Sequence, residues 1–175
     1  MSLLSYKNTR LRALEHSDLD FLFAIENNQK YWSLSNTQLP YSKHILAKYI
    51  ENAHLDIYET KQYRFVIVNA SDEAVGLIDL FNFDPTHRRA GVGILVLDKF
   101  QHKGFGSNAL KIVIDYAFSH LQLHQLYANI LATNTNSIQL FNKYNFEQVG
   151  IKKDWIYTDN QYTNEVLYQL INTKL

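Results

Sequence analysis

The sequence has no cysteine, few prolines and glycines, and no excess of charge of either sign. The absence of cysteine excludes disulfides, thiolate metal sites and a cysteine nucleophile. Two prolines and six glycines argue against a collagen-like or linker-rich chain. Lys+Arg and Asp+Glu number 17 each, so the formal net charge is zero. No global attraction toward nucleic acid or an anionic membrane is therefore expected.

Long apolar runs are also missing, because no stretch approaches the roughly 18 uninterrupted apolar residues of a membrane-spanning helix. Residues 1–7 lack a basic start followed by an apolar run, so no signal peptide is expected and the cytoplasm is the expected location. What is present is 46% hydrophobic and 14% aromatic residues in a chain of 175. That content supports a sizeable core, and we expect residues 1–175 to form one domain.

Hydrophobic spacing predicts a mixed order of strands and helices. Strands are expected over residues 9–14, 64–69, 74–83, 89–97, 125–131, 147–157 and 162–171. Helices are expected to begin at Ser17, at Ser42, after Ser107 and after the loop Asn134–Ser137, while residues 31–41 are expected to be irregular. Short connections make the three middle strands antiparallel. The predicted class is α+β, with a mixed, mostly antiparallel sheet of about seven strands flanked by about four helices.

The segment Gln101–Ser107 joins a strand end, two glycines and a helix start. The first turn of a helix leaves N–H groups unpaired, and the helix dipole adds partial positive charge there. Glycine lets a phosphate approach the backbone, and His102 and Lys103 can add charge. The segment therefore predicts an anion site, with an ordinary tight turn as the alternative. It matches neither the phosphate loop of nucleoside triphosphatases nor the three-glycine dinucleotide fingerprint.

Gly91 and Gly93 lie inside the strand that precedes this loop. Glycine weakens a strand unless the backbone bends there or something needs the space. A strand that bends away from its neighbour exposes N–H and C=O groups, with which the amides of a pantetheine arm can pair. We therefore expect an open, ligand-binding strand edge ahead of the anion site.

In this setting the chain resembles the GNAT N-acetyltransferases. Their phosphate-binding motif, Gln/Arg-x-x-Gly-x-Gly/Ala at a strand-to-helix junction, is matched by Gln101–Gly106. Their later Asn-loop-helix, which ends in Gly-Phe, is matched by Asn134–Phe146, with Asn145 where glycine is usual. The resemblance covers residues 8–171 and includes the order of elements, so it implies a GNAT-like fold.

The resemblance implies acetyl-CoA as cosubstrate and no metal. The pyrophosphate is expected on the N–H groups of His102–Ser107, the pantetheine arm along the preceding strand, and the helix that holds Phe141 beside the thioester. Asn134 is expected to bond the arm. The expected cofactor contacts are Leu95, Val96, Leu97, Gln101, His102, Lys103, Gly104, Phe105, Gly106, Ser107, Asn134 and Phe141.

Without a cysteine, direct attack of an amine on the thioester is the expected route. Many family members place a tyrosine as general acid at the position that is Phe141 here. Tyr144, three residues on, is the candidate substitute, with packing in the core or against the cofactor as the alternative. Related polyamine enzymes carry a glutamate at Gly91. Asp79, in an otherwise apolar strand, is the candidate base or substrate ligand, with pairing to an arginine or tyrosine as the alternative.

The segments 87–90 and 160–164 are similar to spermidine N-acetyltransferases, and ribosomal-protein N-acetyltransferases are the other similar branch. The acceptor is expected to contact aromatic residues and one carboxylate, with core packing as the alternative for the aromatics: Trp32, Tyr41, Asp79 and Tyr157. The early loop Ser35–Gln38 lacks the acidic cluster of the polyamine enzymes.

We expect a small, polyamine-like amine as the acceptor. A protein N-terminus is the alternative acceptor, and a non-catalytic CoA-binding or sensor domain is the alternative function. A homo-oligomer is expected, because the aromatic C-terminal hairpin and the edge strands need cover. No basic stripe points to nucleic acid, and no segment points to a membrane partner.

Overall fold

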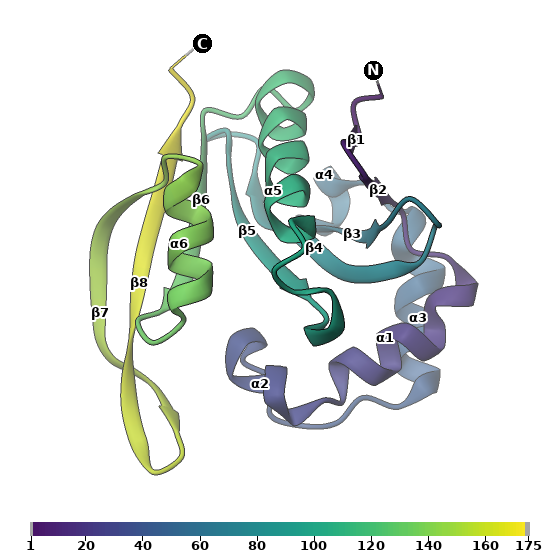
Figure 1. Ribbon diagram of the computed structural model, residues 1–175, viewed down its shortest axis with the longest axis horizontal. Coiled ribbons are helices and arrows are strands. Elements are labelled where there is room, and N and C mark those ends of the chain that lie inside the picture. Colours follow the sequence, from purple (N-terminus) through teal and green to yellow (C-terminus); the bar gives the residue numbers. More distant parts are fainter. Residues whose placement is uncertain (1, 174–175) are drawn as a thin grey trace.

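Eight strands form one sheet among residues 2–173, which are the residues that the computed structural model describes (Figure 1). In chain order the strands are β1 (Ser5–Tyr6), β2 (Thr9–Arg12), β3 (Tyr63–Val68), β4 (Ala74–Asp84), β5 (Arg89–Val96), β6 (Gln125–Leu131), β7 (Glu147–Thr158) and β8 (Gln161–Ile171). The spatial order is β1-β2-β3-β4-β5-β6-β8-β7, and only β5 and β6 pair in parallel. The expected mixed, mostly antiparallel sheet is confirmed.

Six α-helices accompany the sheet within residues 2–173. They are α1 (Leu19–Glu26), α2 (Gln29–Ser35), α3 (Lys43–Glu51), α4 (Ile57–Thr60), α5 (Phe105–Asp115) and α6 (Thr135–Lys143). A π-helical turn, Tyr116–His120, continues α5. Across the described residues, no helix is both long enough and apolar enough to cross a membrane.

The helix starts agree only in part with expectation. Ser42 caps α3 as predicted, because its hydroxyl accepts a hydrogen bond from the Ile45 N–H at 3.2 Å. Ser17 does not cap α1, whose N-cap is Asp18. The segment expected to be irregular, residues 31–41, overlaps most of α2, which is too short to show a clear hydrophobic period in the sequence. The Asn28 side chain caps its start, and Asn36 ends it in the left-handed region at φ 54°.

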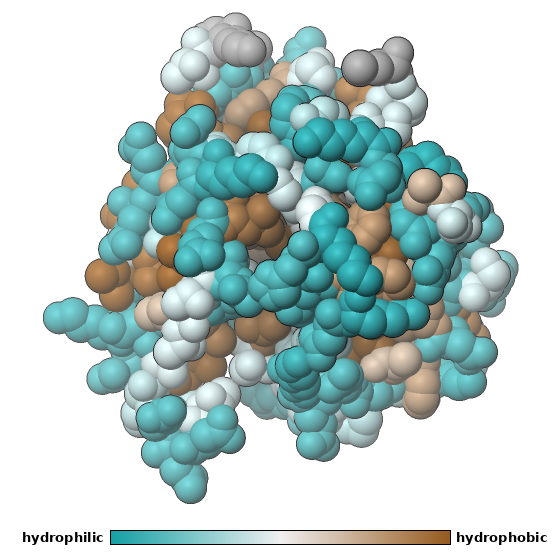
Figure 2. Space-filling view, viewed as in Figure 1, coloured by the Kyte–Doolittle hydropathy of each residue, from teal (hydrophilic) through white to brown (hydrophobic). Residues whose placement is uncertain are grey.

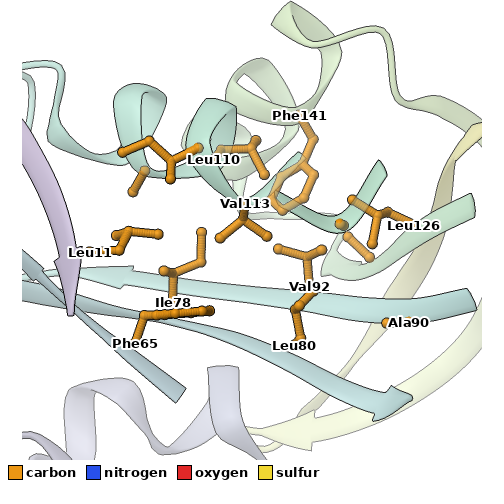
Figure 3. Close-up of a cluster of buried hydrophobic side chains, with 14 of the residues drawn as sticks. Leu11, Phe65, Ile78, Leu80, Ala90, Val92, Leu110, Val113, Leu126 and Phe141 are labelled. Carbon is orange, nitrogen blue, oxygen red and sulfur yellow. The ribbon is translucent and has the colours of Figure 1, made fainter. Parts of the chain in front are cut away.

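The core lies on both faces of the sheet, because successive residues of a strand point to opposite sides. On one face, the β3 and β4 side chains of Phe65, Ile78 and Leu80 pack under Leu110 and Val113 of α5 (Figure 3). On the other face, α1 and α3 cover the remaining strand residues, and the buried members of that cluster include Leu22, Ile25, Leu46, Ile50, Val66 and Val68. Both faces of the sheet are thus buried at β3 and β4.

The sheet opens at its centre, between β5 and β6. The two strands pair only from Arg89–Gly91 to Gln125–Tyr127, and beyond that point they diverge. The rest of β5, Val92–Val96, keeps its pairing with β4 but has no partner on the β6 side. The glycines of β5 lie where the pairing ends, as expected for a strand that leaves its neighbour. One edge of β5 therefore offers N–H and C=O groups that no strand pairs in the middle of the molecule, although Val96 O accepts a hydrogen bond from Gln101 Nε2 at 3.2 Å.

Candidate active site

A cavity of about 430 Å³ lies where the open edge of β5 meets the start of α5 and one face of α6. We call it the loop cavity. Its volume falls within the roughly 300–1,000 Å³ of small-molecule sites. Its wall consists of Tyr31, Leu34, Ile94, Leu95, Val96, Phe100, Gln101, His102, Gly104, Phe105, Gly106, Ser107, Asn134, Asn136, Ser137, Gln139, Leu140 and Lys143. Most of the predicted cofactor contacts are thus brought to one place.

The backbone of the loop before α5 is shaped for an anion. His102 and Gly104 both adopt positive φ, at 60° and 86°, so that neighbouring N–H groups turn toward a common centre. The first i to i−4 bond of the helix runs from Asn108 N–H to Gly104 O at 2.9 Å. The N–H groups of Phe105, Gly106 and Ser107 precede that bond and have no intrahelical acceptor. They are available to a ligand in the loop cavity.

Positive charge at this cavity comes from a residue that the sequence did not indicate. Lys143, in the last turn of α6, lines the cavity and places its Nζ 2.8 Å from Ser107 Oγ at the start of α5. Lys103 does not line the cavity, and its Nζ lies 5.5 Å from the centre of the Phe100 ring instead. The cation that the motif suggested is therefore supplied by another element.

Two further predicted cofactor contacts lie outside the cavity wall. Phe141 is buried at 2% exposure and points from α6 into the core toward Val113, against Phe146 (Figure 3). Leu97 is also absent from the wall, and Ile94 takes its place, so the lining part of β5 lies slightly earlier than expected. Asn134 does line the cavity, and its side chain caps α6 by accepting the Ser137 N–H at 3.2 Å.

A second cavity, of about 510 Å³, adjoins the first. We call it the strand cavity. The two share four wall residues, Tyr31, Leu34, Ile94 and Leu95, so both reach the same stretch of β5 from different sides. On the face shown in Figure 2, recessed hydrophobic residues lie near the centre of the view, between polar residues. A ligand on one side can therefore meet a ligand on the other side beside β5.

Asp79 lines the strand cavity, but both of its oxygens are engaged. Arg64 donates from Nε and Nη2 to Asp79 Oδ1 and Oδ2, each at 2.8 Å, and from Nη1 to Glu26 Oε1 at 2.5 Å. Burial alone would lower the pKa of Arg64, but the charge and hydrogen bonds of Asp79 outweigh burial and raise it. Asp79 is therefore held as one half of a bidentate ion pair, the alternative that the sequence left open.

The opposite wall holds a second ion pair. Lys152 on β7 donates from Nζ to Glu165 Oε1 on β8 at 2.6 Å, and both residues line the strand cavity with Asn129 and Trp155. The sequence does not single out Glu165 or Lys152, because a carboxylate and an amine on two strands of a hairpin form no motif. With Glu26, Asp79 and Arg64, the wall carries three acidic and two basic side chains.

Gly91 makes room for an aromatic floor in the strand cavity. A Cβ at Gly91 would lie 2.4 Å from the Phe81 ring, so any other residue here would force that ring to move. Phe81 lines the cavity and meets Tyr127 edge-on with ring centroids 5.8 Å apart. The position at which related enzymes carry a carboxylate is thus covered by an apolar ring.

Of the four predicted substrate contacts, Asp79 lines the strand cavity, and the three aromatic residues do not. Trp32 turns away, and its Nε1 donates to Glu26 O at 2.9 Å. Tyr41 is exposed, and Tyr157 is exposed at the far end of the hairpin against Tyr162. Two other aromatic residues line the cavity instead: Tyr31, which is buried, and Trp155, which lies at the strand bulge and is 57% exposed.

Tyr144 also lies apart from both cavities. It is the C-cap of α6, and its hydroxyl donates to Ser107 O at 2.8 Å and lies 2.9 Å from Ser107 Oγ. That hydroxyl therefore holds the end of α6 against the start of α5. The geometry favours a structural role for Tyr144 over the predicted catalytic one.

Within residues 2–173, no group of three or more histidine, cysteine, aspartate or glutamate side chains is placed to hold a metal ion. The site thus consists of an anion-binding helix start, an open strand edge and a charged cavity. Such an arrangement can hold a long phosphorylated ligand along the strand edge and present its end to a second molecule.

Comparison with known proteins gives a family match and full-length relatives. Residues 8–147 match the acetyltransferase (GNAT) domain family. The chain is 27% identical over 167 residues to spermidine N(1)-acetyltransferase from Vibrio cholerae, covering 94% of this chain and 93% of that protein. It is 29% identical over 165 residues to the Escherichia coli enzyme of the same name, covering 93% and 85%.

Solved structures give the same result. The Vibrio cholerae spermidine N-acetyltransferase in complex with CoA and spermine superposes with a TM-score of 0.86 at 26% identity, covering 95% of this chain and 97% of that one. A dodecameric structure of the same enzyme superposes with a TM-score of 0.80 at 28% identity, covering 95% of each chain.

Proposed function

Because this chain belongs to the GNAT acetyltransferase family, we propose that it transfers the acetyl group of acetyl-CoA directly to an amine of a polyamine-like small molecule. One observation carries the proposal: the loop cavity and the strand cavity meet at Ile94 and Leu95 on the unpaired edge of β5. A ligand anchored by phosphate in the first cavity ends where an acceptor in the second can reach it.

The residues of the loop cavity fit acetyl-CoA. The N–H groups of 105–107 and the ammonium of Lys143 suit a pyrophosphate, since charge-assisted hydrogen bonds to phosphate are strong. Alternate residues along the open edge of β5 turn N–H and C=O groups toward β6, where pantetheine amides can pair with them. The same edge offers an N–H donor to a thioester oxygen.

The chemistry needs no covalent intermediate on the protein. When bound, acetyl-CoA supplies a thioester whose carbonyl carbon the amine attacks, the C–S bond then breaks, and the sulfur takes up a proton from water. An amine with a pKa of about 10.4 is less than about 0.1% neutral at pH 7, so a proton must leave the ammonium first. The net negative charge of the strand cavity attracts the ammonium, and water in that open cavity carries its proton away.

A polyamine suits the strand cavity better than a neutral acceptor. Glu26, Asp79 and Glu165 outnumber Arg64 and Lys152, so the wall has a formal charge of −1. Tyr31 of α2 also lines this cavity, and its hydroxyl donates a hydrogen bond to Asp98 Oδ1 at 3.4 Å. Burial and the Asp98 charge raise the pKa of Tyr31, so its hydroxyl stays protonated near neutral pH.

The test is an amine panel with acetyl-CoA, read as free thiol release and as acetylated product by mass spectrometry. We expect spermidine and spermine to exceed butylamine at least about tenfold in kcat/KM, the effect of about 1.4 kcal/mol from an added ammonium. A preference for a peptide N-terminus would contradict a small-amine acceptor. CoA binding with no acetylation of any amine would contradict catalysis altogether.

Replacement of Tyr144 by phenylalanine tests its structural role. We expect kcat and acetyl-CoA affinity to stay within about twofold of the wild type, and the free energy of unfolding to fall by about 1 kcal/mol through the lost bonds to Ser107. Initial rates at saturating amine and urea unfolding measure both. A loss of about 100-fold in kcat with unchanged acetyl-CoA affinity would instead establish Tyr144 as the general acid.

We also propose that residues 1–175 form one domain, because β8 pairs with β6 along its length and so joins the C-terminal hairpin to the central sheet. We propose a homo-oligomer in the cytoplasm. Edge strand β7 and its neighbour β8 expose the large apolar side chains of Val149, Ile151, Trp155, Tyr157 and Tyr162. The related Vibrio cholerae enzyme is dodecameric.

A further inference from the structure

The ammonium group of Lys152 lies in a complete binding site for a cation. Its Nζ is 2.6 Å from Glu165 Oε1, 3.4 Å from Asn129 Oδ1 and 4.9 Å from the centre of a Trp155 ring. A carboxylate, an amide oxygen and an indole face are the groups that proteins use to hold an ammonium ion. They come from three different strands, β8, β6 and β7, and all line the strand cavity.

The two partners of this ion pair differ in how firmly they are held. Glu165 lies on β8, which pairs on both sides, and its side chain is 11% exposed. Lys152 lies on the edge strand β7, and its side chain is 36% exposed on a flexible four-carbon stem. The carboxylate is thus fixed and needs a cation, since an unpaired buried charge is costly. The lysine can leave for solvent if another ammonium replaces it.

The other carboxylates of the cavity cannot exchange partners in this way. Asp79 and Glu26 share Arg64, which grips Asp79 with two parallel hydrogen bonds in a planar fork. A single ammonium does not reproduce that geometry. Glu165 is therefore the acidic residue of this wall whose partner has the same chemistry as an amine substrate.

We propose that Glu165, Asn129 and Trp155 form a subsite for a second, non-reacting ammonium group of the acceptor, and that Lys152 occupies this subsite when no acceptor is bound. The inference rests on the proposed function, because it assigns the remote end of an acceptor whose reacting amine lies beside Ile94 and Leu95. Displacement of Lys152 leaves the wall with one cation fewer, so the cavity becomes more acidic as the polyamine enters. Amines with a single charge gain nothing from this exchange.

The test removes the competing ammonium. In Lys152→Met, the stem is kept and the charge is lost, so we expect the KM for spermidine to fall about three- to tenfold while the KM for butylamine stays unchanged. The matched control is Lys153→Met, the same change one residue along β7, where the side chain is exposed and does not line the strand cavity. This control is expected to leave both KM values within twofold.

The complementary variant, Glu165→Gln, keeps the shape of the side chain and removes its charge. We expect the KM for spermidine to rise at least tenfold, with the KM for butylamine and the Kd for acetyl-CoA within about twofold of the wild type. Thermal unfolding checks that each variant is folded. A spermidine KM that is unchanged or raised in Lys152→Met would make the Lys152–Glu165 pair purely structural and overturn the proposal.

Calorimetric titration of spermidine into the full-length protein with CoA separates this inference from the proposed reaction. If the wild type acetylates no amine yet Lys152→Met binds spermidine more tightly than the wild type, the subsite stands and the transferase proposal fails. If the wild type acetylates spermidine but neither variant changes its KM or Kd, the reaction stands and the subsite is refuted.

Discussion

Gly104→Val is expected to weaken acetyl-CoA binding by at least about 100-fold, a loss of about 2.7 kcal/mol. Gly104 has φ 86°, a conformation that β-branched residues essentially never adopt. No atom lies within 4 Å of the position that its Cβ would take. The valine side chain would therefore project into open space at the start of α5, where the phosphates are expected, and the backbone strain would turn the N–H groups of the loop away from them.

The measurement is calorimetric titration with CoA, accompanied by thermal unfolding. Gly150→Val is the matched control, because Gly150 also has no atom near its Cβ position but lies on β7 without positive φ. Gly104→Asn separates conformation from bulk, since asparagine tolerates positive φ, and an intermediate loss of affinity is expected. If Gly104→Val folds and binds CoA within threefold of the wild type, the loop does not hold the diphosphate.

Arg64→Met is expected to destabilise the fold by about 3 kcal/mol, the lower end of the cost of breaking a buried ion pair. The change leaves two carboxylates without their cation, Asp79 and Glu26, whose side chains are 28% and 15% exposed. It also removes the cation that lies 5.6 Å from the centre of the Tyr49 ring. Urea unfolding at pH 7 measures the loss.

A double-mutant cycle with Asp79→Asn decides whether the ion pair is the cause. In Arg64→Met, Asp79 has already lost its cation. Asp79→Asn is therefore expected to lower the free energy of unfolding less in that background than in the wild type, by about 1–3 kcal/mol. Lys30→Met is the control, since its pair with Asp98 is more than half exposed and is expected to contribute under about 1 kcal/mol. Additive effects of the Arg64 and Asp79 changes would rule out the coupling.

The local signals in the sequence were sufficient for much of the fold and for the position of the loop cavity. The limits of β6 agree with expectation residue for residue, because the apolar residues Leu126, Ala128 and Ile130 alternate along it and are the ones the structure buries. Gln101–Gly106 located the loop cavity correctly, since a glycine-containing helix start binds anions through its own backbone. The helix α2 was missed because seven residues give too little period to detect.

The side chains of the acceptor site were less accessible to sequence reasoning. Trp32 and Tyr31 are adjacent in sequence, yet only Tyr31 faces the strand cavity, and the phase of a short helix decides which one does. Phe141 was expected beside the thioester but is turned into the core by the packing of α6 on Phe146. Composition cannot distinguish such neighbours.

The sequence by itself determined the α+β class, the loop that offers its N–H groups, and the glycines at which β5 leaves its neighbour. Those features depend on backbone conformation, which nearby residues set. Only the tertiary structure decided that Lys143 supplies the cation of the loop cavity, that Arg64 forms an ion pair with Asp79, and that Lys152 forms one with Glu165. These contacts join residues that are distant in sequence and are brought together by strand pairing and helix packing. The net charge of a cavity is the sum of the charges of all such side chains in its wall.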